Sequence, residues 1–394
     1  MDSRELSLLL TAEGLRLLDS LPPYSAGGAA GQVSALRKAG HPADLVAAVL
    51  TQARLREKAA QKFGPFADRL LYTPAGLEQA TRLKVAALHA GRFREAGATR
   101  VADLGCGIGA DALALSALDL AVRAVERDEV TAAVASYNLA TFPDAEVVLG
   151  DAEQADLTGI DAVYLDPARR TGGTENTTRI TRAADYSPSV DFAFDLAERM
   201  PTGIKLGPGF DRQLIPAHAE AQWVSVDGQV VEMGLWFTSL ARPGIRRSAL
   251  VIRADAAHEL TAAEDSTDAE PRELGEYVYE PDGAVIRARL IGDLAGSIGA
   301  GMLSPGIAYL TGDTLVQTPF ASAFRVRERL PAGEGNLKKA LRERGIGTLE
   351  IKKRGIDVDP ALLRRRLALK GPESATLIMT RVAGEHEALL VQRV

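Results

Sequence analysis

Apolar residues recur at helical spacing along the first 60 residues of the chain. Leucines follow this spacing through SRELSLLLTAEGLRLLDSL, which begins at Ser3, and a second helical pattern fills HPADLVAAVLTQARLREKAAQKF, which begins at His41. Pro42 and Asp44 stand near the start of the second segment, where helices favour proline and acidic residues. The glycine-rich stretch SAGGAAGQ separates the two and breaks the pattern. The sequence therefore predicts a helical N-terminal region over residues 1–60.

From about residue 61, short apolar runs alternate with amphipathic segments. LYTPAGLEQATRLKVAALHAGRF predicts a loop that enters a helix at Thr73-Pro74. Predicted strands then follow at RVADLG, AVRAVE, AEVVLGD, DAVYLDP and GIKLG, and the helices between them are GADALALSAL, EVTAAVASYNLATF and PSVDFAFDLAERM. This alternation is typical of a parallel sheet covered by helices. Asp227-Gly228 in AQWVSVDGQVVEMGLWF predicts an antiparallel hairpin that closes the sheet.

The alternation is lost after residue 240. AEDSTDAEPRE is polar throughout and predicts a loop, and EYVYEPDGAVIRARLIGDLAGSIG predicts a strand and a turn followed by either a strand or a helix. The predicted fold class is therefore α/β. A Rossmann-like, doubly wound sheet with an antiparallel closing hairpin occupies residues 61–240. The helical region of residues 1–60 precedes it, and a smaller α+β region of residues 241–394 follows.

Composition also predicts the compartment in which the protein is found. The chain has 394 residues, of which 46% are hydrophobic and 25% charged, and this is ample for a packed core. Its one cysteine, Cys106, allows no disulfide within the chain and fits a reducing cytoplasm. The N-terminus lacks the basic segment of a signal peptide, and no run approaches the roughly 20 apolar residues of a membrane span. We therefore expect a cytoplasmic protein with no membrane segment.

Charge is distributed unevenly along the chain. Between Phe324 and Lys370 there are 14 lysines and arginines but 6 acids, so this segment carries +8. The formal net charge of the whole chain is −6, which leaves −14 for the rest. A basic tail attached to an acidic body suggests that the tail meets an anionic partner. A solvated helical face remains an alternative, because many of these cations alternate with acids or stand at helical spacing.

The most concentrated signal for a ligand is VADLGCGIGAD, residues 101–111. Gly105, Gly107 and Gly109 lie between a predicted strand and a predicted helix, so a backbone must turn sharply or approach a ligand closely there. A helix N-terminus at the carboxyl end of a parallel strand is the usual nucleotide position in such sheets. GCGIGA also satisfies the dinucleotide pattern G-x-G-x-x-G/A, so the glycines alone do not select the cofactor.

Acids at successive strand ends distinguish a dinucleotide from a nucleoside that carries positive charge. Asp103, Glu126, Asp151 and Asp166 each lie at the end of a predicted strand, in chain order. Asp103 would repel a pyrophosphate but tolerates an ammonium or a sulfonium. Glu126 suits a ribose with either cofactor, and Asp151 with the polar residues after it suits an adenine amine. The four acids together favour a cationic nucleoside.

This series of motifs resembles the class I S-adenosylmethionine-dependent methyltransferases, over residues 63–240. VADLGCGIG is similar to their first motif, Glu126 to the ribose-binding acid, Asp151 to the adenine-binding acid, and DPAR to the catalytic loop. The resemblance implies methyl transfer from S-adenosylmethionine, with no metal. The cofactor-binding residues that it implies are Thr73, Gln79, Asp103, Gly105, Gly107, Gly109, Glu126, Arg127, Asp151 and Ala152.

The acceptor loop resembles that of enzymes that methylate exocyclic base amines, but only in part. Such families carry (D/N/S)-P-P-(Y/F/W), in which the aromatic residue stacks on the base. Asp166 and Pro167 match the first two positions, whereas Ala168 and Arg169 replace the second proline and the aromatic residue. The resemblance implies catalytic roles for Asp166, Pro167 and Arg169. For Arg169, stacking on a base, holding a phosphate and forming a structural ion pair all stay open.

Two longer resemblances point to RNA. LYTPAGLEQATRLKVA, DPARRTGG and YSPSVDFAFDLA are similar to segments of trimethylguanosine synthase-like enzymes, which act on an exocyclic guanine nitrogen of RNA. This likeness places Thr73 and Gln79 at the methionine end of the cofactor. GTLEIKKRGIDVDPALLRRRLALKG and ATLIMTRV resemble the THUMP-like C-terminal domain, here at about residues 320–394, which is related to modules that bind structured RNA.

The sequence thus predicts an S-adenosylmethionine-dependent methyltransferase that acts on a base nitrogen of structured RNA, such as rRNA or tRNA. Two alternatives stay open. The acceptor is a protein or a small molecule in one, and in the other the chain binds RNA but is catalytically idle.

Overall fold

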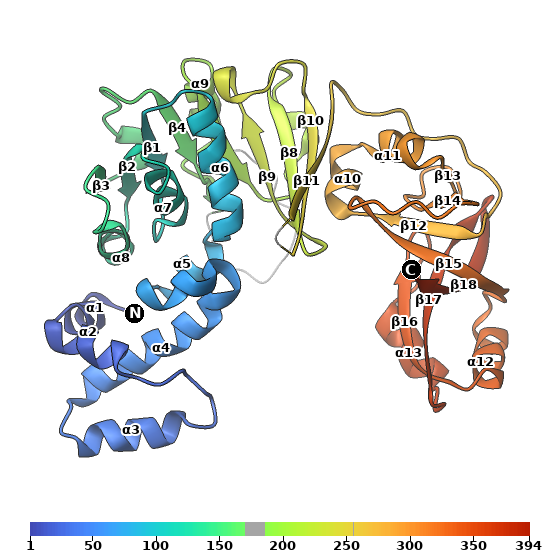
Figure 1. The fold of residues 1–394 in the computed structure, drawn as a ribbon, viewed down its shortest axis with the longest axis horizontal. Coiled ribbons are helices and arrows are strands. Elements are labelled where there is room, and N and C mark those ends of the chain that lie inside the picture. Colours follow the sequence, from blue (N-terminus) through green and yellow to red (C-terminus); the bar gives the residue numbers. More distant parts are fainter. Residues whose placement is uncertain (170–185, 255) are drawn as a thin grey trace. The chain divides into compact units, whose positions relative to one another are not determined.

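The computed structural model describes residues 1–169, 186–254 and 256–394, without the side chains of Ala168 and Arg169 (Figure 1). The chain divides into two compact units. The first comprises Met1–Leu206 and Leu235–Ala241, and the second comprises Gly207–Gly234 and Arg242–Val394. This division differs from the three predicted regions, whose boundaries stay a prediction. In the described part of the chain, no helix combines the length and the apolar character that crossing a membrane requires.

The N-terminal residues of the first unit form the predicted helical region. Its helices are α1 (Ser3–Leu9), α2 (Ala12–Asp19), α3 (Ala29–Lys38) and α4 (Ala43–Phe63). The first predicted helix is divided in two because Thr11 caps α2, accepting a hydrogen bond from the backbone N–H of Gly14. The prediction of a break at SAGGAAGQ did not include a helix between α2 and α4, and the structure adds α3 there. α3 begins inside this stretch, where two alanines follow Gly28, the residue before the helix.

A parallel sheet forms the centre of the first unit. Its strands are β1 (Arg100–Leu104), β2 (Ala121–Glu126), β3 (Ala145–Leu149), β4 (Ala162–Leu165) and β7 (Thr202–Leu206), in the order β7-β4-β1-β2-β3. Chain order reverses between β1 and β4, and this is the switch point where doubly wound sheets bind ligands. The predicted Rossmann-like fold class is thereby confirmed.

Helices follow the strands of this unit as predicted. They are α5 (Pro74–Gln79), α6 (Leu83–Glu95), α7 (Ala110–Ser116), α8 (Glu129–Leu139) and α9 (Val190–Ala197). α6, α7 and α8 share one apolar core with β1, β2 and β4, in which the largest side chains are Phe93, Tyr164 and Trp236. The short strands β5 (Ala168–Arg169) and β6 (Tyr186–Ser187) pair with each other. The 3₁₀ turns of the chain include η1 (Gly64–Arg69), η2 (Ala152–Gln154), η4 (Arg212–Leu214) and η5 (Thr238–Leu240).

The predicted closing hairpin is present. β8 (Glu220–Val226) and β9 (Gln229–Trp236) are neighbours, joined by Asp227 and Gly228, which both have positive φ (49° and 83°). Positive φ at both positions is what a two-residue hairpin turn with the right twist requires. Two further strands, β10 (Arg247–Arg253) and β11 (Ala256–Ala262), extend the sheet. The full order is β11-β10-β8-β9-β7-β4-β1-β2-β3, so the sheet continues past residue 240.

The remainder of the second unit is built on a seven-stranded sheet. Its strands are β12 (Tyr277–Pro281), β13 (Gly301–Met302), β14 (Leu310–Gly312), β15 (Ala321–Leu330), β16 (Ile346–Lys353), β17 (Glu373–Val382) and β18 (Glu385–Arg393), in the order β13-β14-β12-β15-β18-β17-β16. The helices are α10 (Gly283–Ala288), α11 (Ile291–Ile298), α12 (Glu334–Glu343) and α13 (Pro360–Leu367). A helix therefore follows β12, which decides between the two predicted alternatives at that point.

Candidate functional site

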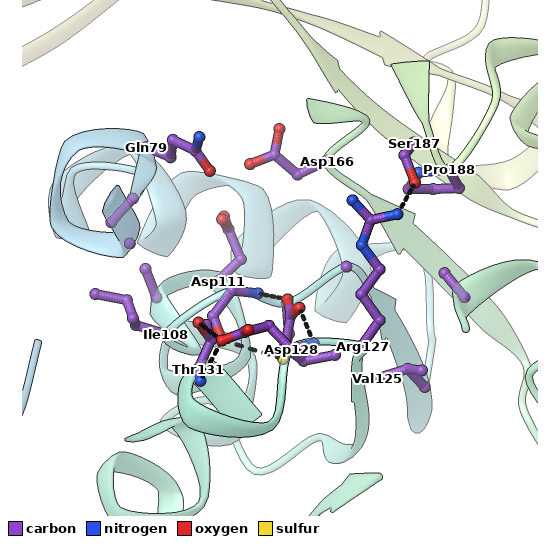
Figure 2. A pocket seen from close by; sticks show the side chains of 18 of the residues that line it. Gln79, Ile108, Asp111, Val125, Arg127, Asp128, Thr131, Asp166, Ser187 and Pro188 are labelled. Carbon is purple, nitrogen blue, oxygen red and sulfur yellow. Dashed lines mark hydrogen bonds between the residues drawn. The ribbon is translucent and has the colours of Figure 1, made fainter. Parts of the chain in front are cut away.

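A cavity of about 450 Å³ lies at the carboxyl ends of β1, β2, β3 and β4 (Figure 2). Its walls include Gln79 at the end of α5, the glycine loop between β1 and α7, and the residues that follow β2, β3 and β4. Every lining residue belongs to the first unit. The cavity thus occupies the switch point of the sheet, where the sequence placed the ligand.

The glycine loop adopts a conformation that L-residues with side chains rarely reach. Gly105, Gly107 and Gly109 all have positive φ, at 89°, 56° and 84°. The N–H groups of Gly105 and Cys106 donate to the carbonyl of Val125 at the end of β2, with distances of 2.9 and 3.1 Å. Gly109 then immediately precedes α7. This path exposes backbone and the start of a helix to the cavity.

Glu126 fixes the glycine loop from the neighbouring strand. Its Oε2 accepts a hydrogen bond from the backbone N–H of Gly107 at 3.1 Å, and its Oε1 accepts one from the N–H of Asp128 at 2.9 Å. Asp128 in turn caps α8 by accepting from the N–H of Thr131. One carboxylate therefore orders both the loop after β1 and the turn after β2, and it lines the cavity between them.

The extended segment that enters α5 is held by side chains on both flanks. Gln52 exchanges two hydrogen bonds with the backbone of Tyr72, at 2.7 and 3.1 Å. Asn138 of α8 does the same with Leu71, and its Nδ2 also donates to the carbonyl of Ile108 in the glycine loop at 2.9 Å. The sequence gave no sign of these roles, because each depends on residues more than 15 positions away in the chain.

The two predicted residues of α5 differ in their surroundings. Thr73 is buried, and its hydroxyl caps the helix by accepting from the N–H of Gly76 at 2.9 Å. It does not line the cavity, whereas Gln79 does. Gly76 is required for the close approach of α5 to the glycine loop, because a Cβ there would lie 2.4 Å from Ile108 Cγ2.

A chain of linked polar groups runs inward from Asp166, whose side chain is 31% exposed. The ammonium of Lys205 on β7 lies 2.5 Å from Asp166 Oδ2 and 3.0 Å from the hydroxyl of Thr81. Thr81 donates to Asp111 Oδ2 at 2.6 Å, and Nδ1 of His89 lies 3.0 Å from Asp111 Oδ1. Of these, Asp166, Thr81 and Asp111 line the cavity. The sequence prediction missed Lys205, Thr81 and Asp111. The signal that the sequence offered was Lys205 itself, a lone lysine in the apolar strand GIKLG.

Acids dominate the charge of the cavity. Among its described lining residues, five are acidic (Asp111, Glu126, Asp128, Asp151 and Asp166), and Arg127 carries the positive charge. Arg127 extends toward Ser187, whose hydroxyl accepts its hydrogen bond at 3.0 Å (Figure 2). Such a lining disfavours a pyrophosphate and suits a ligand that bears an ammonium and a sulfonium, as the acids at the strand ends predicted.

Asp103 differs from the other strand-end acids. Its residue is 1% exposed and does not line the cavity, and its Oδ2 has no hydrogen-bond partner among the described residues. Burial, with the negative charges of Asp111 and Asp166, raises the pKa of Asp103 well above its usual range. Burial also acts to raise the pKa of Asp111, but the hydrogen bond and charge of His89, with Lys205 and Thr81, outweigh it and lower that pKa.

This difference predicts that Asp103 destabilises the fold at neutral pH. Because its folded-state pKa is raised, the stability linked to Asp103 is present in acid and is lost as pH rises through that pKa. We expect Asp103→Asn to increase the free energy of unfolding at pH 7 by on the order of 1 kcal/mol, and the gain to vanish below about pH 4. Denaturant unfolding across this pH range measures the effect. A loss of stability at pH 7 would contradict it.

The other predicted residues lie around the cavity or beyond it. Asp151 and Ala152 line it after β3, where the Asp151 carboxylate accepts from the N–H of Glu153 at 2.9 Å. Pro167 is buried and is not part of the lining. Arg169 belongs to β5, but its side chain lies outside the described structure.

Known proteins resemble the chain over most of its length. An uncharacterized S-adenosylmethionine-dependent methyltransferase of Mycobacterium tuberculosis, in strains CDC 1551 and H37Rv, is 35% identical over 340 residues, or 83% of this chain and 90% of the relative. The solved structure of a candidate methyltransferase from Porphyromonas gingivalis W83 superposes with a TM-score of 0.75 at 22% identity, covering 100% of this chain and 99% of that one. This second likeness confirms the fold.

Two family models match segments of the chain. Residues 321–393 match the model described as THUMP domain-like, which confirms the resemblance drawn from the C-terminal sequence. Residues 2–59 match a model described as a domain of unknown function, and they coincide with most of the N-terminal helical region.

Proposed function

Because the chain belongs to the S-adenosylmethionine-dependent methyltransferases, we propose that it methylates a base nitrogen of structured RNA, such as rRNA or tRNA. The enzyme class and the cofactor follow from the family, whereas the methyl acceptor is the part that we propose. The match of residues 321–393 to a THUMP-like domain supports it most, because the resemblance of this segment implies binding of structured RNA.

The cavity fits the cofactor of the family. When bound, S-adenosylmethionine supplies a methyl group made electrophilic by the sulfonium. In this proposal Glu126 holds the ribose, Asp151 and Ala152 hold the adenine beside Arg127, and the glycine loop approaches the cofactor closely. Gln79 and Asp111 take the methionine end, because both line the cavity and the lowered pKa of Asp111 keeps its charge. Thr73 and Asp103 support this wall from behind, as both are buried and outside the lining.

Asp166 is the residue best suited to orient an acceptor amine. The lone pair of an exocyclic base amine is delocalised into the ring, and a carboxylate that accepts an amine hydrogen makes that lone pair more available. The ion pair with Lys205 fixes the position of the Asp166 carboxylate at the cavity wall. The transfer itself depends mainly on alignment of nucleophile and methyl group. Pro167 fixes the backbone after β4, and we assign Arg169 to the base or a phosphate.

The C-terminal segment carries more cations than form ion pairs with acids, and Lys338, Arg342, Arg364 and Arg365 of this surplus lie on α12 and α13. Lys338 of α12 donates to the carbonyl of Arg366 in α13, so the two helices are neighbours. Eight of the 14 cations of residues 324–370 form no ion pair with an acid among the described residues: Arg327, Lys338, Arg342, Lys353, Arg354, Arg364, Arg365 and Lys370. This surplus supports contact with phosphates over a purely solvated face.

Methylation of total RNA decides the nature of the acceptor. We expect the purified protein, with methyl-labelled S-adenosylmethionine, to label RNA from a strain that lacks it and to leave RNA from the parent strain unlabelled. Total protein and the small-molecule extract of the same strain are the parallel acceptors. Mass spectrometry of nucleosides from both strains then identifies the modified base. Label in protein or in small molecules, with none in RNA at any salt concentration, would overturn the proposal.

RNA binding without methyl transfer is the second candidate function. The absence of the second proline and of the aromatic residue after Asp166-Pro167 favours it, because nothing in that loop offers a ring for stacking on a base. In that case the nucleoside composition of RNA would be the same in both strains, while the purified protein would still bind RNA.

A further inference from the structure

A second cavity, of about 620 Å³, lies entirely within the second unit. The tip of the β8–β9 hairpin and the N-terminus of α10 contribute to its wall, together with residues of the seven-stranded sheet. Four cations line it: Arg253, Lys352, Arg354 and Arg393. They come from three parts of the chain, at the ends of β10 and β18 and, for Lys352 and Arg354, at the end of β16 and just after it. The catalytic cavity shares no residue with this one.

Three acids line this cavity, and one of them, Asp227, accepts a hydrogen bond from the backbone N–H of Ala254 at 3.2 Å. Glu280 of β12 forms an ion pair with Lys352 at 2.8 Å. Asp282 caps α10 by accepting from the N–H of Ala284, and its other oxygen accepts from the hydroxyl of Ser225. Arg253 lies 3.6 Å from the same oxygen. Lys352 and Arg253 are thus largely neutralised. Four cations against three acids leave an excess of one positive charge, to which Arg354 and Arg393 contribute.

Arg354 and Arg393 are held by aromatic rings. The guanidinium of Arg354 lies 5.3 Å from the ring centre of Tyr309, and that of Arg393 lies 4.9 Å from the ring centre of Phe324. The Nε of Arg354 is buried and has no hydrogen-bond partner among the described residues. The nearest acid to Arg393 is Glu350, at 3.9 Å. Stacking fixes the planes of the two guanidinium groups but leaves donors for an anion.

The side of the sheet also matters. Leu349 and Ile351 of β16 pack in one core with Leu337 of α12 and Leu363 of α13. Side chains alternate along a strand, so Lys352 points to the face opposite these helices. Arg354 and Arg393 lie against Tyr309 and Phe324, which belong to a different core from that of α12 and α13. The anion-binding donors are therefore separate from the basic surface of these helices.

We propose that this cavity binds a phosphate group of the RNA that the enzyme methylates, through Arg354 and Arg393. A planar guanidinium offers paired N–H donors that match two phosphate oxygens, and a buried donor without a partner gains most from such a ligand. The inference rests on the proposed function for its source of phosphate. Free phosphate has the same chemistry, and the experiment separates the two.

Two substitutions and one control test the proposal on the full-length protein. Arg354→Met and Arg393→Met each remove a guanidinium from the cavity. Arg381→Met is the matched control, since Arg381 is exposed on β17 and outside the cavity. Binding of mixed tRNA is measured by fluorescence anisotropy from 50 to 300 mM salt, and binding of inorganic phosphate is measured by ³¹P NMR line broadening. Thermal unfolding identifies any variant that fails to fold, and Arg393, whose side chain is 54% exposed, is the safer of the two positions.

We expect each cavity variant to lower tRNA affinity and to reduce the slope of log affinity against log salt by about 0.7–0.9, the value of one phosphate contact. Phosphate broadening is expected to weaken in both, and the control to match the parent in every assay. Unchanged tRNA affinity and slope in both variants would overturn the inference while leaving RNA methylation intact. If the variants lose phosphate binding but keep tRNA binding, the cavity binds free phosphate and not a phosphate group of the RNA. If the parent binds and methylates no RNA, the proposed function fails as well.

Discussion

Replacing Asp166 with alanine is expected to lower methyl transfer to RNA by about 10²–10⁴-fold, the usual contribution of a well-placed general base. The carboxylate lies at the wall of the cofactor cavity and is fixed by Lys205 at 2.5 Å. Because the proposed role of Asp166 is to orient the acceptor, the affinity for S-adenosylhomocysteine should change little. Transfer of labelled methyl to RNA from the deletion strain and calorimetric titration of S-adenosylhomocysteine measure the two effects separately.

Two further variants test whether a loss of activity comes from a folding defect. Asp166→Ala leaves the largely buried ammonium of Lys205 without its partner, which destabilises proteins strongly. Combining it with Lys205→Met removes both charges, and this double variant should fold and still be inactive. Asp195→Ala is the control, because Asp195 is exposed on α9 and outside the cavity. Unchanged transfer of methyl to RNA by a folded Asp166→Ala variant would show that Asp166 does not orient the acceptor. Unchanged RNA methylation in cells that carry Asp166→Ala would instead favour the catalytically idle alternative.

Glu126→Gln should weaken binding of S-adenosylhomocysteine by about 10–150-fold, the equivalent of one lost hydrogen bond to a charged group. The carboxylate accepts from two backbone N–H groups, those of Gly107 and Asp128. An amide in its place presents an NH₂ to one of these donors, so the glycine loop loses one of its fixed points. The same substitution removes an acceptor for the ribose hydroxyls. Calorimetry at constant ionic strength measures the loss.

Glu129→Gln is the matched control for this experiment. This substitution makes the same chemical change three residues later in the chain. Glu129 lies on the exposed first turn of α8 and outside the cavity. We expect its affinity to equal that of the parent. If Glu126→Gln binds S-adenosylhomocysteine as tightly as the parent does, Glu126 has no part in holding the cofactor.

Local sequence patterns were sufficient for most of the fold. Strand-helix alternation between residues 61 and 240 predicted the parallel sheet, and Asp227-Gly228 predicted its hairpin, because these signals are carried by neighbouring residues. The pattern failed where a tertiary partner decides. β10 was missed because its place in the sheet depends on pairing with β8, whose residues lie more than 20 positions away, and β11 pairs in turn with β10.

For the candidate site, the sequence by itself determined which glycines and acids stand at the ends of the parallel strands. Positive-φ glycines after β1 and acids after β2, β3 and β4 must meet at one edge, because parallel strands place their carboxyl ends together. That argument needs no side-chain position, and it selected Glu126, Asp151 and Asp166 for the cavity.

Only the tertiary structure decided which polar groups face the cavity and which lie behind it. Asp103 and Asp111 look equivalent in DLGCGIGAD, yet Asp103 is buried with a raised pKa while Asp111 lines the cavity with a lowered one. The difference comes from Thr81 and His89, which bond Asp111 from 30 and 22 residues away. A carboxyl group's charge depends on its burial and its partners, and neither is written in the residues beside it.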